Sequence, residues 1–195
     1  LQAQDPLMAG VIEFTRQLGI DAADGEAIAR WTGSAAHASS TAQERMRFAS
    51  IMLALAANRT EPNLRADEAV EWALRKRWIG VDGEGRAMIA AAACANATTK
   101  AQIPALERIA PAASLHEGRI WGLATRLARR FSGGSISALG DSALTVSDGQ
   151  LVLSMRQSIA PLYTLHAEKD LKALAQALDL LPVVQVIDAE GRTIS

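Results

Sequence analysis

Hydrophobic residues recur every three or four positions through most of the first 140 residues, which is the spacing of amphipathic helices. Glycine, proline and small polar residues divide this region into segments of ordinary helix length. We therefore predict helices over residues 5–18, 21–32, 41–57, 67–78, 103–109 and 114–131, and an alanine-rich helix that begins at Arg86.

The segment over residues 41–57 is apolar on nearly every side, which is typical of a helix at the centre of a helical domain. Thr41 and Glu44 have the spacing of a capping box at the start of this helix. Ser114 and Glu117 repeat that spacing further along the chain. We therefore expect the first of these helices to be buried and each of them to begin at its capping box.

The pattern changes after Gly140. Two short hydrophobic runs flank a turn at Asp148-Gly149, which predicts a β-hairpin. An amphipathic helix with leucines at helical spacing follows, and residues 183–187 predict a last strand. The sequence thus predicts an α+β protein that is mainly α, with a helical domain over residues 1–140 and a small β-β-α-β appendage over residues 141–195 that packs on it.

The amino-acid composition limits the classes of partner that this chain is expected to bind. Its net charge is −1 and 4% of its residues are aromatic, so neither an overall positive field nor a base-stacking platform favours nucleic acid. The apolar run around Cys94 is too short to span a membrane. Because a single cysteine forms no internal disulfide, we expect a cytoplasmic protein in which Cys94 is a buried packing residue.

Local groups of basic residues are the feature that points most directly to a function. The guanidinium fork matches phosphate oxygens, so such a group favours a polyphosphate chain as ligand. The alternative interpretation is a solvated face whose charges complement helix ends. The predicted polyphosphate-binding residues are Arg59, Arg65, Arg75, Lys76 and Arg77, with Arg86 nearby, and a second surface is formed by Arg119, Arg126, Arg129 and Arg130.

The sequence offers little support for catalysis. His37, His116 and His166 lie in different predicted elements and lack the spacing of metal ligands. The hydroxyl-rich loop around His37 contains no acid that could orient it. Gly133-Gly134 follows a helix, which indicates a helix end rather than a phosphate loop. We predict neither catalytic residues nor metal ligands in this chain.

Three segments, in order along the chain, carry a family resemblance. They are Ala3-Gln4-Asp5-Pro6-Leu7, then residues 58–65 with residues 80–86, and finally the helix over 119–131 with Ser132-Gly133-Gly134 and the hairpin over 148–153. Together they resemble the region that follows the catalytic core in proteins of the exopolyphosphatase/guanosine-pentaphosphatase (Ppx/GppA) family.

The resemblance implies the C-terminal, HD-like helical domain of a cytoplasmic phosphohydrolase that removes terminal phosphate from polyphosphate or guanosine pentaphosphate. It also implies an N-terminal actin-like core with glycine-rich phosphate loops and Mg²⁺. None of those catalytic parts is found in this sequence. The positions where the family pattern places metal ligands are held here by Leu55, Glu61, Arg75 and Gly83.

We therefore expect an auxiliary domain that aids polyphosphate binding and dimerisation without a complete active site of its own. Its expected partners are its own N-terminal catalytic core, a second copy in a homodimer, and polyphosphate or a phosphorylated guanosine nucleotide, but not nucleic acid or a membrane. We expect no cofactor in this chain, with Mg²⁺ in the catalytic core. The alternatives are a free-standing HD-like metal-dependent phosphohydrolase and a structural dimerisation module.

Overall fold

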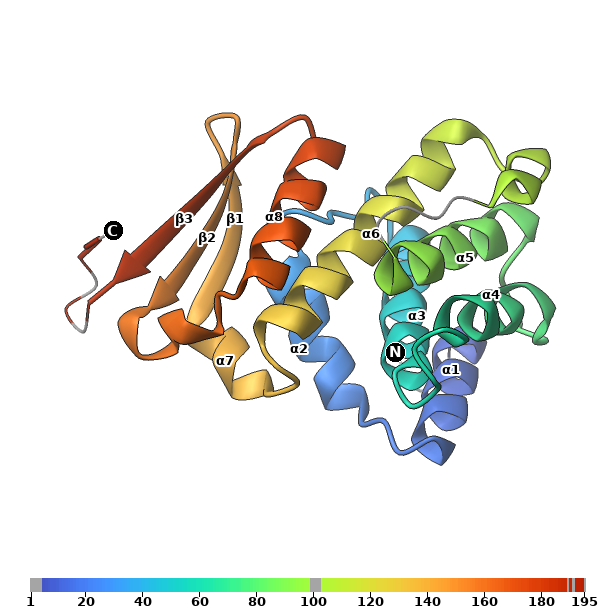
Figure 1. Cartoon of the computed structure of the whole chain (residues 1–195). Coiled ribbons are helices and arrows are strands. Elements are labelled where there is room, and N and C mark those ends of the chain that lie inside the picture. The colour runs from blue at the N-terminus through green and yellow to red at the C-terminus, as the bar shows by residue number, and fades with distance from the viewer. Residues whose placement is uncertain (1–4, 99–102, 189, 191, 195) are drawn as a thin grey trace.

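The computed structural model describes residues 5–98, 103–188, 190 and 192–194. Helices fill most of the first 140 residues, and a three-stranded sheet lies at the C-terminal end (Figure 1). The chain is therefore an α+β protein that is mainly α, as predicted. Ala3 and Gln4, from the first segment of the family resemblance, lie outside the described residues.

The helical part precedes a C-terminal unit that we define as residues 142–187. The helical part contains α1 (Pro6–Gln17), α2 (Ala22–Thr32), α3 (Thr41–Ala57), α4 (Arg65–Arg75), α5 (Gly83–Ala97), the 3-10 helix η2 (Pro104–Arg108), α6 (Ala112–Phe131) and α7 (Ile136–Gly140). The C-terminal unit contains β1 (Ser142–Ser147), β2 (Gln150–Arg156), η3 (Gln157–Leu162), α8 (Leu165–Ala177) and β3 (Leu181–Ile187). The short helices α7 and η3 were not predicted from the sequence.

The first helix begins directly after its cap, Asp5. The Asp5 carboxylate accepts hydrogen bonds from the backbone N–H groups of Leu7 (3.0 Å) and Met8 (3.2 Å), and it also accepts one from Arg45 of α3 (2.8 Å). Burial raises the pKa of Asp5, but these donors outweigh it and hold the pKa below its ordinary value. Asp5 thus joins the first helix to the central one.

Helix α3 is the buried centre of the helical part, as its all-round hydrophobicity predicted. It contacts α1, α2, α4, α5 and α6, and its Ile51, Met52 and Leu53 side chains have no exposed surface. The predicted capping box is wrong, because Ser40 rather than Thr41 caps the helix. The Ser40 hydroxyl accepts a hydrogen bond from the Gln43 N–H group at 3.2 Å.

The boundaries of α4 and α5 differ from those predicted. Helix α4 ends at Arg75, because the next residue has extended backbone, and the predicted final residue Trp78 therefore lies outside it. Helix α5 begins three residues before Arg86, because the Asp82 carboxylate accepts a hydrogen bond from Gly85 N–H at 2.8 Å. Because Asp82 caps the helix from within a glycine-rich turn, the helix starts closer to the N-terminus than predicted.

Helix α6 also begins earlier than predicted, directly after Pro111. Ser114 does not cap it, because its hydroxyl donates a hydrogen bond to Glu84 of α5. Proline before a helix fixes an extended backbone at that point, so the chain turns into α6 at Ala112 without a side-chain cap.

Helices α5 and α6 pack at unusually close range. A Cβ atom added at Gly118 would lie 2.4 Å from the Met88 carbonyl oxygen, and one at Gly122 would lie 2.1 Å from the Ala92 carbonyl oxygen. Such contacts are far shorter than van der Waals distances, so only glycine fits at either position. The alanine-rich sequence of α5 supplies small side chains that allow this close contact.

The C-terminal unit has the predicted β-β-α-β order. Strands β1 and β2 pair antiparallel around Asp148-Gly149, whose φ angles of 49° and 74° are both positive, as a tight hairpin turn needs. The chain then crosses through α8, and β3 pairs parallel to β2 with Val184 beside Leu153. Such a parallel pairing requires a crossover connection, which α8 provides.

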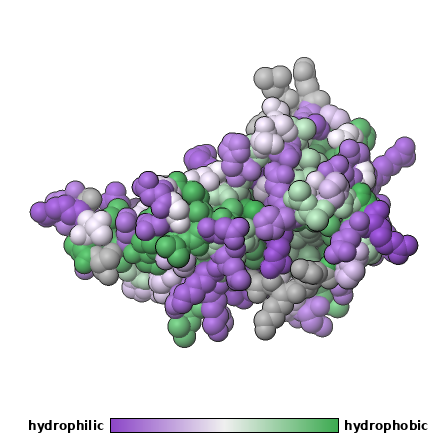
Figure 2. Space-filling view, turned by 90° about the horizontal axis from the view of Figure 1, so that it is seen from above, coloured by the Kyte–Doolittle hydropathy of each residue, from purple (hydrophilic) through white to green (hydrophobic). Residues whose placement is uncertain are grey.

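The C-terminal unit packs against the helical part through a shared core. Leu171 and Leu174 of α8 are buried in the same hydrophobic cluster as the central helices. Trp31 of α2 donates a hydrogen bond to Ser142 of β1 at 3.0 Å. Farther from this contact, Leu165 is 73% exposed, and the view from above shows green hydrophobic residues among purple ones over the C-terminal unit (Figure 2).

Candidate functional site

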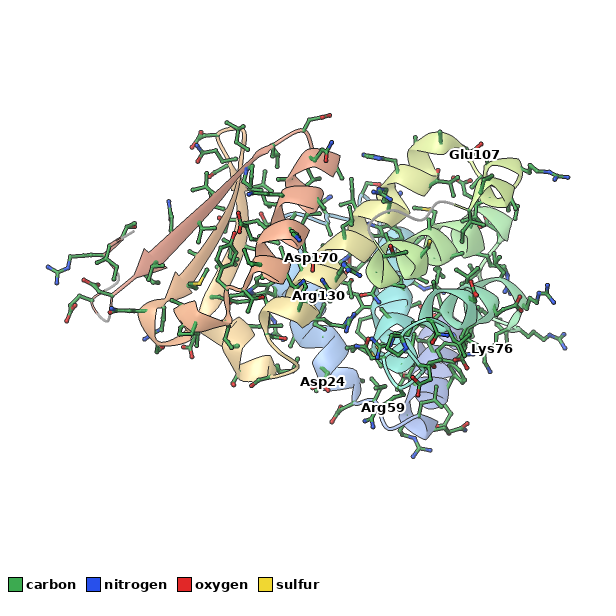
Figure 3. The ribbon with its side chains drawn as sticks, in the orientation of Figure 1. Asp24, Arg59, Lys76, Glu107, Arg130 and Asp170 are labelled. Atoms are coloured by element: carbon green, nitrogen blue, oxygen red, sulfur yellow. The ribbon has the colours of Figure 1, made fainter. Side chains whose placement is uncertain are left out.

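The structure spreads the predicted polyphosphate-binding residues over both ends of α4. Arg65 begins this helix and Arg75 ends it, which puts their backbones about 15 Å apart along the helix axis. Arg59 donates a hydrogen bond to the Gly19 carbonyl at the end of α1 (3.2 Å). Figure 3 labels Arg59 and Lys76 at separate positions.

At the end of α4, the basic side chains are either paired or exposed to solvent. Arg75 pairs with Glu71 at 3.0 Å, and 79% of its side chain is exposed. The Lys76 ammonium lies 3.8 Å from the centre of the Phe14 ring, in a cation–π contact. Arg77 is exposed. This end of the helix therefore matches the solvated face that was the alternative interpretation.

Arg86 has a structural position at the same end of α4. Its guanidinium donates hydrogen bonds to the carbonyl oxygens of Lys76 (2.6 Å) and Trp78 (3.0 Å). Carbonyl groups at a helix C-terminus lack partners within the helix, and a cation satisfies them favourably. Arg86 thus fixes the chain that leaves α4.

Arg65 belongs instead with three arginines from α6. We call Arg65, Arg126, Arg129 and Arg130 the arginine cluster. Each of the other three acts electrostatically on the guanidinium of Arg129. Arg126 and Arg129 both bind Asn96 at the end of α5, Arg126 and Arg130 share Asp170 of α8, and Figure 3 labels Arg130 next to Asp170. The cluster therefore combines one residue of the first predicted group with three of the second.

Arg126 is the largely buried member of the cluster that binds both α5 and α8. Its Nε donates to Asp170 Oδ1 of α8 at 2.9 Å, and the exposed fractions of the two side chains are 11% and 3%. Its Nη1 donates to the carbonyl oxygens of Asn96 (2.8 Å) and Ala97 (2.6 Å) at the end of α5. Arg126 therefore ties α5, α6 and the C-terminal unit together.

Arg129 is a cation whose charge the protein compensates poorly. Its Nε donates to the Asn96 side-chain oxygen at 3.2 Å. Burial, together with the charges of Arg126, Arg65 and Arg130, lowers the pKa of Arg129 to about 10, and Asp170 opposes this shift. Among the described residues, Asp170 is the one carboxylate that acts on Arg129. The charged form of Arg129 is thus destabilised by its surroundings.

Arg130 and Arg65, whose charges act on Arg129, make fewer or longer contacts with the protein than Arg126 does. Arg130 Nη1 lies 3.4 Å from Asp170 Oδ2, which is a long contact, and 36% of its side chain is exposed. Arg65 donates from Nε to the Thr60 carbonyl (2.9 Å) and from Nη2 to the Asn58 carbonyl (3.3 Å). These bonds orient the Arg65 guanidinium without neutralising its charge.

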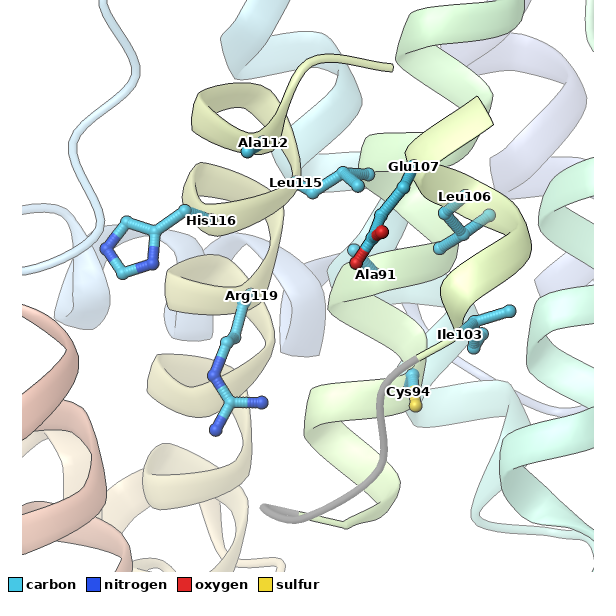
Figure 4. Close-up of a pocket in the computed structure, with 9 residues that line it drawn as sticks. All are labelled: Ala91, Cys94, Ile103, Leu106, Glu107, Ala112, Leu115, His116 and Arg119. Carbon is cyan, nitrogen blue, oxygen red and sulfur yellow. The ribbon is translucent and has the colours of Figure 1, made fainter. Parts of the chain in front are cut away.

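Arg119, the remaining member of the second predicted group, lies elsewhere. It lines a pocket of about 240 Å³ between α5, η2 and α6, together with Glu107, His116 and Cys94 (Figure 4). Cys94 is buried, as predicted, and burial raises the pKa of its thiol. The thiol is therefore protonated near neutral pH and unsuited to nucleophilic chemistry.

The described residues do not assemble a metal site. Within residues 5–98, 103–188, 190 and 192–194, no three His, Cys, Asp or Glu side chains gather as ligands would. His37 and His166 are exposed, and His116 Nε2 lies 3.0 Å from the Ala177 carbonyl oxygen.

Comparison with known proteins leaves the family open. The sequence matches no model of a known protein family and no curated protein. No helix in the described part of the chain is both long enough and apolar enough to cross a membrane.

Proposed function

We propose that this chain is an auxiliary, phosphate-binding domain of a phosphohydrolase that resembles the Ppx/GppA family, without a complete active site of its own. The observation that carries the proposal is the arginine cluster, in which Arg126 and Arg130 share the carboxylate of Asp170 and Arg129 binds the neutral side chain of Asn96. Guanidinium groups bind phosphate oxygens through paired, charge-assisted hydrogen bonds. A condensed phosphate chain supplies the negative charge that the cluster lacks.

The wider setting of this function rests on the family resemblance. We propose that the partner is an N-terminal catalytic core that uses Mg²⁺, that the whole protein is a cytoplasmic homodimer, and that its substrate is polyphosphate or a phosphorylated guanosine nucleotide. The long cationic surface predicted over residues 59–77 is less well supported than the arginine cluster, because its members lie at opposite ends of α4.

Binding of long-chain polyphosphate tests the proposal. Arg129→Gln/Arg130→Gln is expected to weaken binding at least tenfold, because each charge-assisted hydrogen bond contributes about 1.5–3 kcal/mol. The control Arg75→Gln/Arg77→Gln removes the same charge from exposed positions and is expected to change the affinity less than about twofold. Affinities are measured by titration calorimetry at low and physiological salt. The affinities of the wild-type chain and of the control variant should both fall as salt increases.

Two outcomes would contradict this assignment. A larger loss in the Arg75/Arg77 variant than in the Arg129/Arg130 variant would place the polyanion on the surface predicted from sequence. Failure of the wild-type chain to bind polyphosphate at low salt would favour the structural dimerisation module.

Metal analysis and a hydrolysis assay separate the proposal from a free-standing HD-like phosphohydrolase. We expect the purified chain to retain no stoichiometric Mn, Fe, Ni or Zn after dialysis, because the family's ligand positions hold Leu55, Glu61, Arg75 and Gly83. We also expect no release of phosphate from polyphosphate or guanosine pentaphosphate when Mg²⁺ or Mn²⁺ is added. Steady release by protein free of contaminating phosphatase would establish the alternative.

A further inference from the structure

Some guanidinium N–H groups of the arginine cluster donate hydrogen bonds to the protein, and others do not. Arg65 and Arg129 each bind the protein through part of the guanidinium, Arg65 through Nε and Nη2 and Arg129 through Nε. In the described structure, the Nη1 group of Arg65 and both Nη groups of Arg129 have no hydrogen-bond partner. These donors belong to guanidinium groups whose orientation is already fixed.

Fixed orientation matters because an anion site gains affinity when its donors need no reordering. The Arg129 Nε is held by Asn96, whose residue is 4% exposed, and Arg65 is held by two carbonyl groups. A solvated lysine or arginine face would lack these supports. An anion that binds here would therefore meet guanidinium groups that the protein has already oriented.

The balance of charge identifies the class of ligand. Arg129 is crowded by three like charges in a partly buried position, and Asp170 is engaged by Arg126 at 2.9 Å. A tetrahedral dianion with several oxygens can accept from more than one guanidinium at once. An isolated carboxylate offers fewer oxygens and less charge.

We propose that Arg129, Arg65 and Arg130 form a discrete site for one phosphoryl group, with Arg126 as a structural support and Asp170 as a built-in competing anion. This inference rests on the proposed function and makes it more specific, because it assigns one phosphate unit to one place. The phosphoryl group comes either from free orthophosphate or from a unit of a longer chain.

Arg130 is the adjustable member of this site. Its contact with Asp170 is 3.4 Å long and its side chain is 36% exposed, whereas Arg126 binds the same carboxylate at 2.9 Å from a buried position. Arg130 can therefore leave Asp170 for a bound phosphoryl group while Arg126 keeps the carboxylate in place. Competition from Asp170 limits the affinity, which suits a domain that must release its ligand.

Titration calorimetry with orthophosphate and with tripolyphosphate, in chloride buffer of low ionic strength, tests this site. The wild-type chain is expected to bind one orthophosphate with a dissociation constant of roughly 1 mM or tighter. Arg129→Gln is expected to weaken binding at least tenfold, whereas Asp170→Asn is expected to strengthen it about fivefold because the competing charge is removed. The exposed variant Arg75→Gln serves as the control and should leave the affinity unchanged.

A second variant keeps the test decisive if Asp170→Asn does not fold. Arg130→Gln loses one long contact, remains folded, and is expected to weaken orthophosphate binding about fivefold. An unchanged affinity in Arg130→Gln, or no strengthening in a folded Asp170→Asn, would overturn the inference.

The two ligands separate the sources of the phosphoryl group and the two proposals. Orthophosphate binding indicates a site for the free ion, and much tighter tripolyphosphate binding adds a chain that continues beyond it. If long-chain polyphosphate binds but neither short ligand does, the discrete site is wrong and the proposed function stands. If no phosphate ligand binds, both are wrong.

Discussion

Replacing Gly122 by valine is expected to lower the free energy of unfolding by about 4 kcal/mol or more. A Cβ atom at this position would lie 2.1 Å from the Ala92 carbonyl oxygen and 2.8 Å from the Ala95 Cβ atom. Backbone on the facing helix cannot rotate away as a side chain can. Helices α5 and α6 must therefore separate along their contact.

The matched control for this substitution is Gly140→Ala. Gly140 ends α7, and a Cβ atom there would meet no other atom within 4 Å. Its effect on the free energy of unfolding is expected to be within about 0.5 kcal/mol. Urea denaturation followed by circular dichroism measures both variants. A loss below about 1 kcal/mol for Gly122→Val would show that α5 and α6 are not packed as closely as described.

The sequence predicted the kinds of element better than their ends. The buried character of α3 and the Asp148-Gly149 hairpin follow from strong local signals, and both are confirmed. The predicted capping boxes failed because other residues met the same need. Ser40 offered its hydroxyl one position earlier, and Pro111 set the start of α6 without any side-chain cap.

The candidate site was harder to predict, because its members come from distant parts of the sequence. Grouping by sequence proximity joined Arg65 to Arg75, yet an α-helix of this length separates them by its full extent. The packing of α4, α5 and α6 instead brings Arg65 into range of Arg129. The one available signal was the run of arginines at the end of α6, which the sequence singled out as a second surface.

Asp170 gave no comparable sequence signal. It lies on a helix in the C-terminal unit, 40 residues or more from the arginines that it meets. A lone aspartate on an amphipathic helix predicts an exposed charge, whereas the side chain of Asp170 is 3% exposed. The tertiary packing of α8 on α6 creates the buried ion pair, and local sequence patterns do not predict that packing.

Asp170→Ala is expected to lower the free energy of unfolding by about 3–5 kcal/mol, because removing one partner of a buried ion pair leaves the other charge uncompensated. Arg126 is 11% exposed and would keep its two carbonyl acceptors but lose its carboxylate. Arg129 would also lose the carboxylate that opposes the fall of its pKa. Urea denaturation measures the loss.

Two further variants separate the ion pair from general effects of mutating α8. Glu168→Ala removes a carboxylate from the same helix, where its contact with Lys172 is exposed, and is expected to cost less than about 1 kcal/mol. Arg126→Met/Asp170→Leu replaces the whole pair by apolar side chains and is expected to be more stable than Asp170→Ala. If the double variant is instead the less stable, Arg126 stabilises the protein chiefly through the Asn96 and Ala97 carbonyls.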